Sequence, residues 1–139
     1  MAEWTIEYVD RAFERFYLSL TPVTQAVVEA AISAVLAERG IDAFDGGWGK
    51  SLGGGLWEFR IQRSLSSISS LSGVEVPMVS DSGRRVSIRI FCTFYGDRIV
   101  LLLGGYDKGR DPSHRRQQRE IARARAALKR WKSMFGFEQ

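Results

Sequence analysis

Three basic residues are the strongest candidates for chemistry in this chain, because each falls within or just beyond an expected strand. Arg60 and Arg89 lie in segments that we expect to be neighbouring strands, and Lys108 follows the last expected strand. Guanidinium groups bind phosphate in a bidentate manner and stabilise the charge that develops during phosphoryl transfer. A protonated arginine cannot act as a base. The three side chains therefore predict a surface that holds a phosphate and stabilises its charge.

Other reactive groups are few. His114 is the only histidine and Cys92 the only cysteine, so the sequence provides no cluster of His and Cys ligands for a metal. The carboxylates of Glu58, Asp97 and Asp107 are scattered along the chain, which disfavours a glycosidase-like acid–base pair. No Gly-x-Ser-x-Gly elbow is present. We therefore expect a site that needs neither a metal nor another cofactor.

The glycine-rich segment 45–55 contains Gly49-Lys50-Ser51, which is reminiscent of a nucleotide-binding phosphate loop. That motif requires a further glycine where this chain has Phe44, and it requires a strand before it and a helix after it. The surrounding pattern predicts the reverse order. We interpret the segment as a loop, in which Lys50 could still touch a backbone phosphate.

The periodicity of apolar residues predicts the elements that must position these groups. Alternation over 3–9, 56–62 and 86–95 is typical of strands, and the apolar run 99–103 indicates a strand covered on both faces. Helical spacing of apolar residues predicts one helix after Asp10 and a second after Thr21, and both residues are good N-caps. Gly40 is expected to end the second helix. A final helix is expected over 112–132, with Asp111 as its cap and an apolar stripe at Ile121, Ala124, Leu128 and Trp131.

The expected order is thus strand, helix, helix, strand, strand, strand, helix. It predicts an α+β fold in which helices pack against a small four-stranded sheet dominated by antiparallel pairing. We expect one domain over 1–139, with the first two helices forming an antiparallel hairpin. Segment 64–87 is rich in serine, and we interpret it as an insertion into that domain, either a long, mobile loop or an irregular hairpin extension. Its length and composition also suggest an exposed loop that contacts a partner.

The charge of the chain is divided unevenly. Residues 1–58 carry four basic and nine acidic side chains, whereas residues 59–139 carry 16 basic and seven acidic ones, within a total formal charge of +4. This division predicts a basic side that faces a polyanion. The candidate contacts outside the three site residues are Lys50, Arg110, His114, Arg115, Arg116, Arg119 and Arg123.

Composition also restricts the class of protein. The apolar fraction of 45% and the abundance of aromatic residues exclude a disordered chain. The longest apolar run is far too short to span a bilayer, and the N-terminus lacks the pattern of a secretory signal, so we expect no membrane association. A single cysteine fits a reducing cytoplasm, which is the expected location.

An ordered series of short motifs resembles the RelE/ParE toxin superfamily, and in particular its phage-derived HigB-like branch. The series comprises Lys50-Ser51-Leu52, Gly55-Leu56-Trp57-Glu58-Phe59-Arg60, Ile88-Arg89-Ile90, the run 99–103 with Gly105-Tyr106-Asp107-Lys108, and Pro112 with Glu120-Ile121-Ala122-Arg123-Ala124. Three positions depart from that pattern. The Ser-rich stretch separates two strands that the family joins tightly, Asp107-Lys108 stands in place of Lys-Lys, and Gly105-Tyr106 stands in place of Gly-Phe.

The resemblance implies the toxin of a type II toxin–antitoxin system, which cleaves mRNA on the translating ribosome. Arg60, Arg89 and Lys108 would be catalytic, and the seven contacts named above would bind RNA. The ribose 2′-hydroxyl would attack the scissile phosphate without a metal. Lys50, Lys108 and His114 are all candidates for the general base. The implied partners are mRNA, the ribosome and a cognate antitoxin, expected to be a helix-turn-helix HigA-like protein.

Two other functions are compatible with the same residues. One is a gyrase-inhibiting ParE-like toxin, which would act by binding a protein and would need no nuclease chemistry. The other is a non-catalytic nucleic-acid-binding module that uses the basic C-terminal helix. The joint presence of Arg60, Arg89 and Lys108 favours the nuclease over both.

Overall fold

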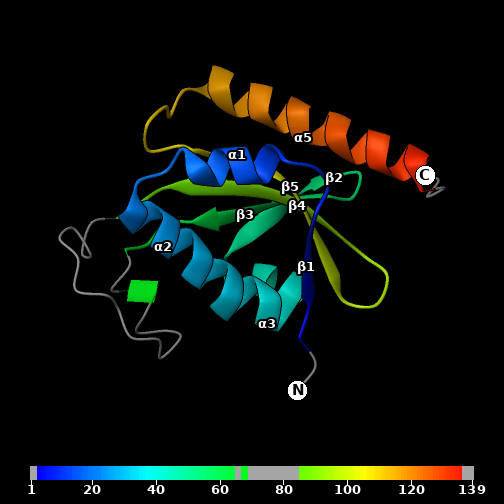
Figure 1. Cartoon of the computed structure of the whole chain (residues 1–139), viewed down its shortest axis with the longest axis horizontal. Helices are drawn as coiled ribbons and strands as arrows, with labels where there is room; N and C mark the ends of the chain where they lie inside the picture. The colour runs from blue at the N-terminus through cyan, green and yellow to red at the C-terminus, as the bar shows by residue number, and fades with distance from the viewer. Residues whose placement is uncertain (1–2, 65–66, 69–84, 136–139) are drawn as a thin grey trace.

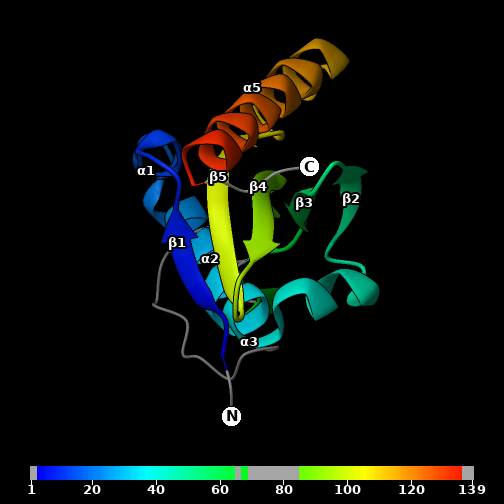
Figure 2. The same cartoon turned by 90° about the vertical axis from the view of Figure 1, so that its right-hand side faces the viewer.

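The computed structural model describes residues 3–64, 67–68 and 85–135, which form a five-stranded sheet with helices on both faces (Figure 1, Figure 2). The strands are β1 (Thr5–Tyr8), β2 (Gly49–Gly53), β3 (Leu56–Ile61), β4 (Ile88–Tyr95) and β5 (Ile99–Asp107). Their order across the sheet is β1-β5-β4-β3-β2, as Figure 2 shows from left to right. The predicted α+β class is confirmed.

The predicted topology needs two corrections. The sheet has five strands instead of four, and it is mixed, because β1 runs parallel to β5 while the other neighbours are antiparallel. The additional strand is β2, which lies inside the segment that we expected to be a loop. Gly54 and Gly55, with φ of +65° and +86°, form the turn that connects β2 to β3. Positive φ at both positions is what a tight type I′ hairpin turn requires.

The first helices follow the predicted pattern with one correction, because Arg11, and not the predicted Asp10, occupies the N-cap position of the first helix. They are α1 (Ala12–Leu18), α2 (Pro22–Ala31), the π-helical turn η1 (Ile32–Leu36), α3 (Ala37–Arg39) and the 3₁₀ segment η2 (Gly40–Gly46). Asp10 Oδ1 accepts a hydrogen bond from Ala12 N at 2.7 Å, and Thr21 Oγ1 accepts one from Thr24 N at 3.3 Å. Gly40 ends α3 with φ of +54°, and a Cβ there would lie 2.0 Å from the Trp4 ring.

The two helices that follow β1 have different positions. Helix α1 lies along β5 beyond the last residue of β1, and α2 with α3 covers one face of the sheet, here called the α2 face (Figure 1). Figure 1 shows α1 and α2 running in opposite senses at an open angle, so the expected helical hairpin is splayed.

The opposite face of the sheet, here called the α5 face, is covered by α5 (His114–Met134) (Figure 1). The helix begins two residues later than predicted because Ser113, and not Asp111, is its cap. Ser113 Oγ accepts a hydrogen bond from Arg116 N at 3.2 Å, and Asp111 Oδ1 accepts one from Ser113 N at 3.2 Å. The predicted apolar stripe faces the sheet, with Ala124, Leu128 and Trp131 buried and Ile121 partly buried.

Two separate apolar cores therefore share one sheet. Val100 and Leu102 of β5 face the α2 core, and Leu101 and Leu103 belong to the α5 core. This confirms that the run 99–103 is a strand covered on both faces. The register between β4 and β5 shifts by one residue between Phe91 and Cys92, which gives β5 a bulge. The turn between the two strands contains three residues, 96–98, instead of the expected two.

Most of the Ser-rich segment 64–87 lies outside the described residues, and so does the interpretation of it as a mobile, partner-contacting loop. Its two ends join, because Ser64 and Arg85 form an antiparallel bridge. Ile68 N donates to Ser64 O at 3.0 Å, and the Ile68 side chain is fully buried in the α2 core. This part of the segment therefore contributes to the fold, although its composition did not predict any burial.

Candidate functional site

The two candidate arginines on strands lie directly opposite each other. Arg60 of β3 pairs in register with Arg89 of β4, and Arg89 pairs with Tyr106 of β5. Residues in register point to the same face of a sheet, so the three side chains form one row across three strands on the α5 face. A second, parallel row carries Lys50, Glu58 and Phe91. The sequence-based expectation that Arg60 and Arg89 are on neighbouring strands is confirmed.

A buried carboxylate holds the two arginines. Arg60 Nε donates to Glu58 Oε1 at 2.7 Å, and Arg89 Nε lies 3.9 Å from the same oxygen. Glu58 has no exposed surface. Three buried polar atoms of this group have no hydrogen-bond partner among the described residues: Glu58 Oε2, Arg89 Nε and the Tyr106 hydroxyl. Unpaired buried polar atoms are rare and costly, and they gather at functional sites.

The row differs in exposure from one end to the other. The Arg60 side chain is 32% exposed, whereas Arg89 is only 3% exposed. Burial lowers the pKa of the Arg89 guanidinium, an effect that the nearby Glu58 carboxylate opposes and Arg60 reinforces. Burial also raises the pKa of Tyr106, and Glu58 adds to that rise, so the phenol keeps its proton. In this conformation, only Arg60 of the row is open to a phosphate from solvent.

The first turns of α5 cover Tyr106. The guanidinium carbon of Arg116 lies 5.4 Å from the centre of the Tyr106 ring, a cation–π contact. Arg116 Nε also donates to Glu120 Oε2 at 2.7 Å, and Arg123 lies 3.6 Å from the same carboxylate oxygen. Tyr106 stacks against Phe91, with ring centres 6.2 Å apart. Three charged residues of α5, Arg116, Glu120 and Arg123, therefore lie next to Tyr106, and their charges alternate in sign.

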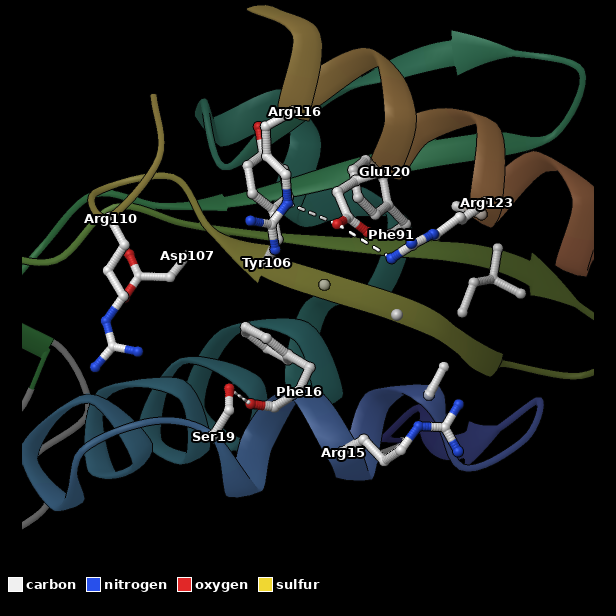
Figure 3. A pocket seen from close by; sticks show the side chains of 15 residues that line it. Arg15, Phe16, Ser19, Phe91, Tyr106, Asp107, Arg110, Arg116, Glu120 and Arg123 are labelled. Carbon is white, nitrogen blue, oxygen red and sulfur yellow. Dashed lines mark hydrogen bonds and ion pairs between the residues drawn. The ribbon is translucent and has the colours of Figure 1, made fainter. Parts of the chain in front are cut away.

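A groove of about 520 Å³ adjoins Tyr106 between α1 and α5 (Figure 3). Figure 3 shows Arg15 and Phe16 of α1 on one side and Arg116, Glu120 and Arg123 of α5 on the other. The glycines of β5, Gly104 and Gly105, form part of the lining between them, and a Cβ at Gly104 would meet nothing within 4 Å. Four arginines and two carboxylates line the groove, which leaves it with positive charge: Arg15, Arg110, Arg116, Arg123, Asp107 and Glu120.

The remaining predicted residues lie at different distances from the row. Lys108 is half-buried in the turn after β5. Lys50 is exposed on the edge strand β2, in register with Glu58. His114 is exposed at the first residue of α5. Arg110 lies 3.8 Å from Asp107 at the rim of the groove.

Two predicted contacts extend the basic surface along α5. Arg115 and Arg119 are exposed, and they share one line of the helix with Arg123 because residues four apart project in nearly the same direction. Arg125 lies on another side of α5 and bonds the backbone of the β2–β3 turn, with Nη1 donating to Gly53 O at 3.1 Å and Nη2 to Leu52 O at 2.9 Å. That residue holds the helix in place.

Sequence reasoning missed two members of the site. Glu58 was considered only as one of several scattered carboxylates, and Tyr106 only as part of a motif. The alternation 56–62 does place Glu58 on the same face as Arg60, so that signal was present. Nothing in the sequence places Tyr106 opposite Arg89. Without the bulge in β5, the same hairpin would put Gly105 there.

Comparisons of this chain with protein-family models, with curated proteins and with solved structures find no match. Within the described residues, no group of three or more His, Cys, Asp or Glu side chains lies close enough together to hold a metal ion. None of the helices in that part of the chain is long and apolar enough to cross a membrane.

Proposed function

We propose that this chain is the toxin of a type II toxin–antitoxin system and that it cleaves mRNA on the ribosome. The observation that carries the proposal is the row of Arg60, Arg89 and Tyr106 with the buried Glu58 beside it on the same face of the sheet. A row of cations at the margin of a basic groove suits a single-stranded polyanion better than a small neutral ligand. The motif series of the RelE/ParE superfamily falls on these same residues.

The proposed reaction is an internal transfer of the phosphodiester. The ribose 2′-oxygen forms a bond to the adjacent phosphorus, the bond from phosphorus to the 5′-oxygen of the next nucleotide breaks, and the products are a 2′,3′-cyclic phosphate and a 5′-hydroxyl. One proton leaves the 2′-hydroxyl and another is added to the departing 5′-oxygen. Arg60 stabilises the charge that develops on the phosphate. Arg89 acts behind it as a positioning residue through Glu58.

The groove between α1 and α5 provides a path for the strand that leads to Arg60. Arg110, Arg116 and Arg123 line it, and each was predicted to bind RNA. Lys50, Lys108 and His114 are the candidates for the proton acceptor: Lys50 lies opposite Glu58 on the edge strand β2, Lys108 follows β5, and His114 is the first residue of α5. A cognate antitoxin, which we propose to be a helix-turn-helix protein, would neutralise the toxin by covering this basic surface.

Expression of the isolated chain in bacterial cells tests the proposal. We expect growth to stop and transcripts to be cut within codons, with 5′-hydroxyl ends that accept phosphate from polynucleotide kinase without prior dephosphorylation. Arg60→Ala should restore growth while the protein still binds RNA, because the other basic residues remain. A matched control is Arg39→Ala, which removes an exposed cation near the end of α3.

Growth arrest with intact transcripts would overturn the nuclease, and accompanying arrest of DNA replication would favour the gyrase-inhibiting alternative. Unchanged cleavage by Arg60→Ala would refute the assigned site. Loss of cleavage on intact ribosomes after the purified toxin alone has been stripped of metal and the chelator removed would refute the metal-independent reaction.

A further inference from the structure

A second pocket lies at the other end of the row, on the β3 side. Its volume is about 460 Å³, and its lining comprises Gly47, Trp48, Arg60, Gln62, Arg63, Ser64, Ser67 and Arg85. Pockets of this size accept ligands as large as a nucleotide. Arg60 belongs both to the row and to this pocket, so the pocket is continuous with the proposed cleavage site. Tyr106 connects the row in the same way to the groove at the opposite end.

The pocket carries three guanidinium groups and no carboxylate among its described lining residues. Arg60 is neutralised by Glu58, but the described residues provide no acidic partner for Arg63 or Arg85. Like charges gathered in one hollow repel each other unless an anion joins them. This surplus distinguishes the pocket from the groove, where Asp107 and Glu120 balance two of the four arginines.

Neutral contacts hold Arg63 and Arg85, which have no acidic partner among the described residues, in place. The guanidinium carbon of Arg63 lies 4.6 Å from the centre of the buried Trp48 ring, and Arg85 Nη2 donates to Gln62 O at 2.7 Å. The backbone beneath them is also fixed, since Arg60 N donates to Trp48 O at 2.7 Å and Ser64 bridges to Arg85. A guanidinium has five N–H donors, and these contacts leave several of them for a ligand.

We propose that the pocket of Arg60, Arg63 and Arg85 is a subsite that binds a second phosphate of the RNA strand, next to the phosphate that is cleaved. This subsite rests on the proposed nuclease function. Arg60 lines this pocket and Tyr106 lines the groove, and the two residues are two strands apart, or about 10 Å. Planar guanidinium groups suit the bidentate recognition of phosphate oxygens.

The test uses the full chain, a short single-stranded 2′-O-methyl oligonucleotide that cannot be cleaved, and inorganic pyrophosphate as a separate probe. Arg85→Gln should weaken binding of the oligonucleotide about tenfold at low salt, the effect of one lost charge-assisted contact. It should also reduce the slope of log affinity against log salt by about 0.7. Arg63→Gln should act in the same direction, and Arg39→Gln should change neither quantity.

With a cleavable RNA, Arg85→Gln should raise KM about tenfold and leave kcat unchanged, because the subsite binds the strand away from the reacting atoms. Oligonucleotide binding that is unaffected by both Arg63→Gln and Arg85→Gln would overturn the subsite. Pyrophosphate binding that is lost in the variants while oligonucleotide binding persists would assign the pocket to a free phosphate compound and would also overturn it.

The two proposals can fail separately. If the wild type binds the oligonucleotide through Arg63 and Arg85 but cuts no transcript, the nuclease is wrong and the phosphate subsite remains. If the wild type cuts transcripts and the pocket variants bind and cut normally, the subsite is wrong and the nuclease remains. Because Arg85 is exposed, we expect its replacement to leave the fold intact. A thermal unfolding curve of each variant verifies that it is folded.

Discussion

At the scale of single residues, the centre of the candidate site is a buried charge network in which one carboxylate serves two arginines. Arg60 and Arg89 lie directly opposite each other in the sheet, a position in which like charges repel. Glu58, which is fully buried, contacts both through Oε1. The carboxylate therefore makes the arginine pair compatible with folding, and in doing so it presents Arg60 toward solvent.

Glu58→Gln should lower the free energy of unfolding by about 3 kcal/mol, because a buried ion pair that loses one partner leaves an uncompensated charge. Urea denaturation measures the change. A matched control is Glu14→Gln, whose partner Arg11 is exposed, and here the loss should stay below about 1 kcal/mol. The double variant Glu58→Gln/Arg89→Met should lose less than the sum of the single losses. Simple additivity would show that the two groups are independent.

Replacing Tyr106, unlike replacing Glu58, should not lower the stability of the fold. Its hydroxyl is buried and has no hydrogen-bond partner among the described residues, so the folded state gains little from it. Tyr106→Phe should leave the free energy of unfolding unchanged or raise it by up to about 1 kcal/mol. If the phenol takes part in the proposed cleavage, kcat should fall in the same variant. A loss of stability above about 1 kcal/mol would show that the hydroxyl has a partner in solution.

At the scale of elements, the sequence predicts those parts that depend on burial and caps. The apolar run 99–103 indicates β5, and Thr21 and Gly40 mark the ends of the second helical segment, because these signals are local. Strand β2 was not predicted because its exposed residues show no alternation of apolar and polar side chains. The strand forms through backbone pairing with β3 across a Gly-Gly turn. The bulge in β5 was not predicted either, because the register of a hairpin depends on both strands together.

These two unpredicted features position most of the site. The bulge brings Tyr106 instead of Gly105 opposite Arg89, and the pairing of β2 with β3 places Lys50 beside Glu58. The prediction that Arg60 and Arg89 lie on neighbouring strands is therefore confirmed, and their role stays a proposal. The alternation 56–62 already places Glu58 on the face of Arg60. The position of Tyr106 opposite Arg89, in contrast, depends on a tertiary register that a single sequence does not contain.

Helix α5 is held at its C-terminal half by cations that bond to backbone carbonyls of the β2–β3 turn. Arg125 donates to Leu52 O and Gly53 O, and Lys132 Nζ donates to Gly54 O at 3.1 Å. Arg125→Ala should lower the free energy of unfolding by about 1 kcal/mol, the net value of a hydrogen bond at a partly exposed position. It should also speed amide hydrogen exchange in β2, since that strand has only one strand neighbour.

Lys129→Ala is the matched control on the same helix, because Lys129 is exposed and makes no hydrogen bond or ion pair to the described residues. Its free energy of unfolding should change by less than about 0.5 kcal/mol. Equal effects of Arg125→Ala and Lys129→Ala would mean that the contacts to the turn do not hold the helix.

At the scale of the whole molecule, the uneven charge along the chain becomes a difference between the two faces of the sheet. Residues 1–58, with nine acidic side chains, supply the helices of the α2 face, and residues 59–139, with 16 basic ones, supply α5 (Figure 1). Arg60 and Arg89 belong to the α5 side as well. The arginines of α5 therefore attract a polyanion to the side that contains the groove and the row.

Replacing Arg115, Arg119 and Arg123 together with glutamine should test this asymmetry, because the three side chains follow one line of α5. If each contacts one phosphate of a single-stranded RNA, the slope of log affinity against log salt should fall by about 2. Fluorescence anisotropy of a labelled RNA over a salt series measures it. Removing Arg11 and Arg39 from the other half of the chain should leave the slope unchanged. Equal loss from both sets of variants would mean that RNA responds to net charge alone, and that the basic side of the sheet does not guide the strand.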